Sequence, residues 1–203
     1  MPQVSQYSAA NLAQALSNAY TTAESIQIKN HFNYLSCYLS SSEIDAKTIV
    51  IEEDYISKDY LHDYSAYYAL CFEQYPKVCK RVHFFKRTFT EEEFNDVLLQ
   101  KKESNQEFWD DYLGFVVVKP IPQKIIGFTL LKTYENGLDS DRMFFGTREY
   151  DIHIFGNELN LNSLSFQEQD SIVAACATTA IWSMLHKASR NPNSVLKTPY
   201  QIT

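Results

Sequence analysis

The chain has 203 residues, of which 45% are hydrophobic and 21% charged, and its formal net charge is −7. These values are ordinary for a globular protein with a sizeable core, and the negative charge argues against nucleic-acid binding, which needs lysine and arginine to neutralise phosphates. The chain contains only 5 glycines and no GxGxxG or GxxxxGK[ST] motif, which excludes the usual glycine-rich loops of nucleotide-binding folds.

The N-terminal segment "MPQVSQYSAANLAQAL" has no basic start and no continuous apolar core, so it does not read as a secretion signal. No apolar run approaches the ~18 residues that a membrane span needs. We therefore expect a cytoplasmic protein without a membrane partner. The cysteines at positions 37, 71, 79 and 176 are irregularly spaced, which favours free thiols in a reducing compartment over a disulfide scaffold.

Residues 8–40 predict helix, because Ser8 is a plausible cap and alanines and leucines follow at helical spacing without glycine or proline. A short β-branched strand is expected at 48–52. Ser57 is expected to cap a further helix that ends near Pro76. The sequence thus predicts a helical N-terminal region over residues 1–75, followed by an α+β region over 76–203.

The helix expected after Ser57 has an unusual set of aromatic residues that recur every three or four positions. This stripe could be an exposed binding surface, but aromatic stripes at helical spacing more often pack on a sheet, and we expect packing here. The residues are Tyr60, Tyr64, Tyr67, Tyr68 and Phe72.

A basic stretch, "KVCKRVHFFKR" at 77–87, interleaves cations with aromatic residues, as some single-strand-binding segments do. The overall charge favours a strand with "VHFF" inside and the basic side chains outside. Thr90 and Glu93 then match a capping box for a helix that should run to about Gln100. The polar stretch "KKESNQE" is expected to be a mobile connection.

From residue 112 the pattern becomes β, with a loop at "ENGLDSD" and the strongest hairpin signal at Gly156–Asn157. We expect an α+β fold with a mostly antiparallel sheet, on which a long C-terminal helix (about 170–188) packs. The expected strands are 48–52, 80–86, 113–119, 125–133, 148–155 and 158–164. The expected packing face of the helix is Val173, Ala177, Ala180, Ile181 and Leu185.

A zinc site is the first chemistry to consider, because His62, Cys71, Cys79 and His83 lie within about twenty residues. Structural zinc sites bring ligands in close pairs on tight turns, whereas Cys79 and His83 are about 13 Å apart along a strand. We expect no metal and no cofactor. The carboxylates at 91–93 and 110–111 lie on exposed-looking segments and predict no acid–base pair.

The segment "QDSIVAACATTAIWSML" (169–185) carries the one candidate nucleophile. A reactive cysteine needs a lowered thiol pKa and a donor for the oxyanion. The segment, about residues 165–188, resembles the active-site region of papain-like cysteine peptidases, especially the bacterial bacteriocin-processing type. There a glutamine precedes a cysteine that opens a helix rich in small residues, so the resemblance implies that Cys176 is the nucleophile and Gln169 the oxyanion-hole donor. The upstream segments "DYISKDYLHDYSAYYALCF", "RVHFF" and "YLGFVVVKPIP" are similar to a bacterial family in which an N-terminal region precedes such a segment.

Two departures from the family pattern bear on catalysis. Six residues separate Gln169 from Cys176, one more than in papain, and a cap at Asp170 or Ser171 would place Cys176 in the second helical turn. The family's base is a histidine far downstream, whereas His186 lies about 15 Å along the same helix. His83 or His153 could serve only in a permuted layout.

Two readings of the whole chain follow. In the first, the chain is the N-terminal part of a papain-like peptidase or related thiol acyl transferase, and the catalytic histidine and its Asn or Asp lie beyond residue 203. The ending "KTPYQIT", which has no polar tail, favours such a continuation. In the second, Cys176 only allows close helix packing, and the chain is a non-catalytic domain that binds a protein or peptide partner. Both readings predict that Cys176 is unreactive in the isolated chain.

Overall fold

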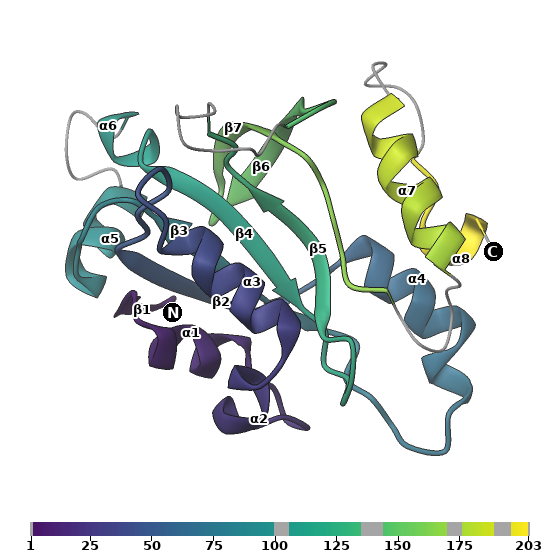
Figure 1. The fold of residues 1–203 in the computed structure, drawn as a ribbon. Coiled ribbons are helices and arrows are strands. Elements are labelled where there is room, and N and C mark those ends of the chain that lie inside the picture. The colour runs from purple at the N-terminus through teal and green to yellow at the C-terminus, as the bar shows by residue number, and fades with distance from the viewer. Residues whose placement is uncertain (1, 100–105, 135–143, 170–175, 189–195, 203) are drawn as a thin grey trace.

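The computed structural model describes residues 2–99, 106–134, 144–169, 176–188 and 196–202, apart from the side chains of Cys176 and Ala188. Its centre is a five-stranded antiparallel sheet in the order β1-β2-β3-β4-β5, with α1–α3 in front of it in Figure 1. The strands are β1 (Gln3–Gln6), β2 (Thr48–Tyr55), β3 (Cys79–Phe85), β4 (Tyr112–Val118) and β5 (Ile126–Leu131).

A second, two-stranded sheet is formed by β6 (Arg148–Ile154) and β7 (Asn157–Ser163). The predicted α+β class, the antiparallel pairing and the hairpin turn are confirmed, with Gly156 at φ 88° in the turn. The expectation that these two strands join the main sheet is wrong, because they form a sheet of their own. Ser163 of β7 links it to the end of β5 through an isolated bridge with Lys132 and a hydrogen bond of 2.6 Å from its hydroxyl to the Leu131 carbonyl. The strand β1 was not predicted, because its four residues show no alternation of apolar and polar side chains.

The N-terminal helices cover one face of the sheet. They are α1 (Ala9–Leu16), α2 (Ala23–Gln27) and α3 (Asn30–Leu39). Ser8 caps α1 as predicted, since its Oγ accepts a hydrogen bond of 3.0 Å from the Asn11 amide. The single helical stretch expected over 8–40 is broken because a new capping box begins at Thr22. Leu12, Leu16 and the other apolar residues of these helices share one core cluster with the facing residues of β2–β5.

The opposite face of the sheet packs against α4 (Lys58–Ala66), the 3₁₀ turn η1 (Tyr68–Leu70), α5 (Glu91–Leu98), α6 (Gln106–Trp109) and the β6–β7 hairpin. The Thr90–Glu93 capping box is confirmed, because each residue's side chain accepts from the other's backbone amide. The proposed division at residue 75 stays a prediction, although residues 1–75 contribute both β1 and β2 to the central sheet.

The aromatic stripe is divided between core and surface. Tyr60 and Tyr68 are buried in the hydrophobic cluster on the opposite face of the sheet from α1–α3, which we call the second core cluster, whereas Phe72 is fully exposed. The expected helix ends at Ala66, well before Pro76, and this ending removes the helical periodicity that would have placed Phe72 beside the others. The packing interpretation therefore holds for Tyr60, Tyr64 and Tyr68, but not for Tyr67 and Phe72.

The C-terminal helices are α7 (Cys176–Ala188) and α8 (Pro199–Ile202), so the described chain has no long C-terminal helix. The packing face predicted for α7 is wrong, since Ala177, Ala180, Ile181 and Leu185 are exposed; Val173 lies outside the described residues. The buried face instead carries Thr178, Trp182 and His186. The Trp182 ring packs edge-on against Phe128 of β5 at 5.6 Å, and burying so large an aromatic surface outweighs burying alanines.

Candidate functional site

Gln169 and Cys176 lie on either side of residues 170–175, which are outside the described part of the chain. Gln169 is half-buried and belongs to neither a helix nor a strand, and Cys176 is the first described residue of α7. The predicted helix start near Asp170 lies outside the described residues. Ala177 and Ala180, two of the residues expected to give Cys176 an apolar setting, are exposed, and the setting of the Cys176 side chain stays a prediction.

The segment that leads to Gln169 is fastened along β5. Phe166 exchanges two backbone hydrogen bonds with Thr129, of 2.9 and 3.2 Å. Two residues further on, the Glu168 amide donates to the Ile126 carbonyl at 2.9 Å. Gln169 therefore directly follows a residue, Glu168, whose backbone is hydrogen-bonded to the start of β5.

Glu168 also holds its carboxylate against α3. Its Oε1 lies 3.2 Å from Nδ1 of His31 and 3.5 Å from Nζ of Lys124. Burial by itself raises the pKa of Glu168, but the hydrogen bond and charge of His31, with smaller contributions from Ile126 and Lys124, bring it below its ordinary value. The carboxylate is thus ionised at neutral pH and ties the segment before Gln169 to the N-terminal helices.

The two histidines considered as alternative bases have other partners in the described structure. Both ring nitrogens of His83 are engaged in the core, and its side chain is fully buried. His153 lies on β6 with 65% of its side chain exposed, and its nearest ionic partner is Glu158 at 3.8 Å. His186 is buried in α7, ten residues from Cys176. None of these positions indicates a pairing with Cys176.

The polar group that the structure does assemble was not predicted. Glu52 of β2 lies opposite Arg81 of β3 in the strand register, and Nε of Arg81 donates to Oε2 of Glu52 at 2.6 Å. The same oxygen is 3.2 Å from Nε2 of His83, whose Nδ1 is 2.9 Å from the Tyr112 hydroxyl. These four side chains form a continuous hydrogen-bonded chain, and Tyr112 at its end belongs to the second core cluster.

The protonation states along this chain follow from burial. Burial lowers the pKa of His83 to about 4 despite the opposing effect of Glu52, so the ring is neutral at neutral pH. Burial also raises the pKa of the Tyr112 hydroxyl. The Tyr112 O–H therefore donates to Nδ1 of His83, and Nε2–H donates to Glu52. For Glu52, burial raises the pKa, but His83 and Arg81 together lower it below its ordinary value, so a carboxylate faces the guanidinium.

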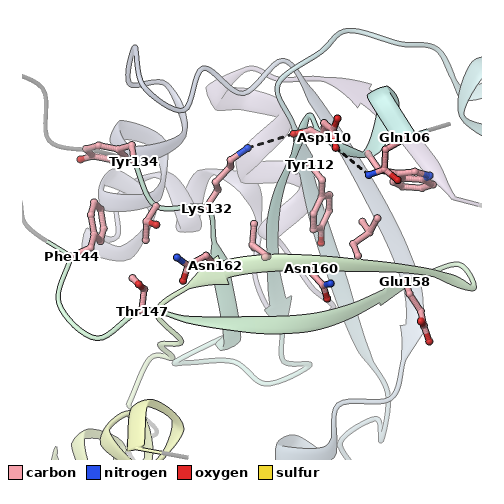
Figure 2. Close-up of a pocket in the computed structure, with 14 residues that line it drawn as sticks. Gln106, Asp110, Tyr112, Lys132, Tyr134, Phe144, Thr147, Glu158, Asn160 and Asn162 are labelled. Atoms are coloured by element: carbon pink, nitrogen blue, oxygen red, sulfur yellow. Dashed lines mark hydrogen bonds between the residues drawn. The ribbon is translucent and has the colours of Figure 1, made fainter. Parts of the chain in front are cut away.

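Two cavities flank this polar chain. Tyr112 lines the larger cavity, of about 960 Å³, which Figure 2 shows between β4, α6 and β7. Its other described lining groups are mainly polar, including Asn160 and Asn162 of β7, and Lys132 closes one side by donating to the Asp110 carbonyl at 3.4 Å. The smaller cavity, of about 530 Å³, is lined by Glu52 and Arg81, which lie at the other end of this hydrogen-bonded series of side chains.

The residues considered for zinc do not form a site. Cys79 is buried, and burial raises the pKa of its thiol to about 12, which disfavours the thiolate that a metal requires. His83 is committed to Glu52 and Tyr112. Within the described residues, no group of three or more His, Cys, Asp or Glu side chains could hold a metal ion.

Sequence reasoning missed the four-residue polar chain because its members come from three strands. The available signal was the alternation along β3, which places Arg81 and His83 on the same face as the buried Phe85. Two polar residues on a buried face need partners, but finding Glu52 and Tyr112 requires the pairing of β2 with β3 and of β3 with β4.

No helix in the described ranges is long and apolar enough to cross a membrane. Comparisons of the chain with protein-family models, with curated proteins and with solved structures give no match.

Proposed function

We propose that this chain is the N-terminal part of a cytoplasmic papain-like cysteine peptidase or related thiol acyl transferase that acts on a protein or peptide. The observation that supports the proposal is that Cys176 lies in α7, seven residues after Gln169. The anchoring of Glu168 on β5 and the packing of Trp182 on Phe128 support a defined position for both ends of this segment.

In this proposal the Cys176 thiolate adds to the carbonyl carbon of the scissile bond, and the Gln169 side-chain amide donates to the oxyanion. The carbon–nitrogen bond then breaks, and the leaving amine takes the proton that a base removed from the thiol. Water attacks the resulting thioester and releases the acid in a peptidase, whereas an amine or alcohol takes the acyl group in a transferase. We place the base outside residues 1–203, since His83 is committed in the core and His186 lies about 15 Å along α7.

The test compares the complete gene product with the isolated 203-residue chain. Peptide hydrolysis or acyl transfer by the complete protein should disappear in Cys176→Ala and fall about 100- to 1000-fold in Gln169→Ala, the usual cost of one oxyanion donor. The matched control is Cys79→Ala, because Cys79 is a buried free thiol at the start of β3. Activity that survives Cys176→Ala would contradict the proposal.

In the isolated chain, we expect Cys176 to react with iodoacetamide no faster than a free thiol at pH 6–8. The measurement uses a Cys37→Ser/Cys71→Ser background, which removes the exposed and half-buried cysteines and leaves the unreactive Cys79. Fast alkylation of Cys176 at pH 6 would place the base within residues 1–203 and contradict that part of the proposal.

A second candidate, a non-catalytic protein-interaction domain, is favoured by the outward face of α7. Ile181, Met184 and Leu185 are 44%, 67% and 37% exposed and lie together at helical spacing. Such a face is typical of a surface that another polypeptide covers. Two variants distinguish the two functions. In an interaction domain, Met184→Asp should abolish binding of the partner polypeptide, whereas Cys176→Ala should leave that binding intact.

A further inference from the structure

Aromatic rings line much of the smaller cavity. It lies between the central sheet, the β6–β7 hairpin and the end of α7, and its volume of about 530 Å³ is typical of small-molecule sites. Flat aromatic walls favour flat aromatic ligands through stacked and edge-to-face contacts. The rings that line it are Tyr55, Phe115, Phe128, Tyr150 and Phe155.

The charges around the cavity are balanced. Among the described lining residues, Arg81 and Arg148 are cationic, and Glu52 and Asp151 are anionic. Arg81 is held by Glu52 at 2.6 Å and by the His153 carbonyl at 2.5 Å, and its guanidinium stacks 4.2 Å above the Tyr55 ring. A charged ligand gains little from such a lining, so the cavity favours an uncharged one.

His186 supplies an imidazole ring to the wall of the cavity. Its side chain lines the cavity and is only 7% exposed, and its Nδ1 is buried without a hydrogen-bond partner in the described structure. The imidazole ring packs against Trp182 and Phe128, with ring centres 4.2 Å and 5.5 Å away. Burial, with the nearby charges of Arg148 and Lys58, lowers the pKa of His186 to about 4, so the ring is neutral at physiological pH.

Arg148 fixes the position of this histidine. Its Nη1 donates to the His186 backbone carbonyl at 3.1 Å, and its guanidinium lies 4.3 Å from the centre of the Tyr150 ring. The end of α7 is thereby attached to β6, and the imidazole is presented to the cavity from a rigid element. The imidazole of His186 is a polar group among the aromatic rings of the wall, and a bound group with a polar ring edge would form a hydrogen bond with it.

We propose that this cavity binds an uncharged, planar aromatic group whose ring edge forms a hydrogen bond with His186. Two sources present this chemistry: a free heteroaromatic molecule and an aromatic side chain of a bound peptide. The inference does not depend on the chemistry proposed for Cys176.

The test uses benzimidazole, whose ring edge carries both a donor and an acceptor, so that the tautomer of His186 does not decide the result. Indene has a closely similar shape but no polar edge. Titrations followed by amide and aromatic NMR shifts should give a Kd of about 1 mM or tighter for benzimidazole, as expected for a ligand of this size. The shifts should centre on Tyr150, Ile152 and His186.

In His186→Phe, which keeps a ring in the wall, benzimidazole should bind about tenfold more weakly, while indene should change less than about twofold. His62→Phe on α4, outside the lining, is the matched control and should bind both probes as the wild type does. Cys176→Ala should also leave binding unchanged, so loss of peptidase activity and loss of this site are distinguishable.

N-acetyl-tryptophanamide distinguishes the two sources. If it binds at the same residues, the site accepts an aromatic side chain of a peptide; if only benzimidazole binds there, the site accepts a free heteroaromatic molecule. The proposal is overturned if neither benzimidazole nor N-acetyl-tryptophanamide binds the wild-type protein, or if the shifts centre on other residues. It is also overturned if His186→Phe is folded and binds benzimidazole with unchanged affinity.

Discussion

At the residue scale, the protein depends on a few ionisable side chains whose charge is set by burial. In the chain from Arg81 through Glu52 and His83 to Tyr112, one cation faces one anion and the other two groups are neutral. Removing one member of such a chain leaves its partner buried and unsatisfied, which costs more than the hydrogen bond itself contributes. Asp59 is a different case, because its burial opposes ionisation.

Asp59→Asn should stabilise the protein at pH 7.5 and much less at pH 4. Burial raises the pKa of Asp59 from 3.8 to about 6, although Lys58, His62 and Trp182 act in the opposite direction. Between these values the folded state binds more protons than the unfolded state, so Asp59 makes the free energy of unfolding fall as pH rises, and the full cost is present above pH 6. Urea unfolding at both pH values should show a gain on the order of 1–3 kcal/mol at pH 7.5.

The matched control for this change is Glu91→Gln, which also lies in the first turn of a helix but is exposed. It should alter the free energy of unfolding by less than about 0.5 kcal/mol at either pH. An equal effect of Asp59→Asn at pH 4 and pH 7.5 would contradict the raised pKa.

At the element scale, β4 and β5 pair closely around Gly114, which has φ 114° and lies opposite Leu131. A Cβ at this position would overlap the backbone carbonyl of Leu130. The tight approach brings Phe115 and Leu130 to the wall of the smaller cavity. Glycine at this position is therefore needed both for the backbone conformation and for the sheet that carries the candidate site.

Gly114→Ala should lower the free energy of unfolding by about 3 kcal/mol or more, because it combines backbone strain with a steric overlap against main-chain atoms. Gly156→Ala is the control: its φ is 88°, but nothing lies within 4 Å of the added Cβ, so only the strain cost of about 1–2 kcal/mol applies. Chemical denaturation of both variants measures the difference. Similar losses would show that close β4–β5 contact is not required.

At the scale of the whole molecule, the net charge of −7 is not offset by an exposed basic surface in the 77–87 stretch. Val82, His83, Phe84 and Phe85 are buried as predicted, but Arg81 is buried too, at 6% exposure, and is paired with Glu52. Lys80 donates to the Ser17 carbonyl at 2.6 Å. The exposed cations that remain, Lys77, Lys86 and Arg87, lie towards the two ends of the stretch.

We expect no binding of DNA or RNA at protein concentrations up to about 1 μM and physiological salt, because too few phosphates can be neutralised. An electrophoretic mobility-shift assay with single- and double-stranded probes checks this. Sub-micromolar binding that weakens as salt is raised would contradict the prediction.

The sequence by itself determined the features that depend on neighbouring residues. Ser8 and Thr90 cap their helices, and Gly156 turns the β6–β7 hairpin, because each acts through groups within a few positions in the chain. Gln169 and Cys176 could likewise be chosen as candidates from a local segment.

Only the tertiary structure decided which distant side chains meet. The pairing of Glu52 with Arg81 follows from the β2–β3 register. Ile181 is exposed because α7 turns Trp182 towards Phe128 instead. The cavity beside His186 exists because a separate hairpin, a helix end and the sheet converge there. The physical reason is that such contacts depend on strand register and on competition between faces for burial, and both are properties of the assembled core.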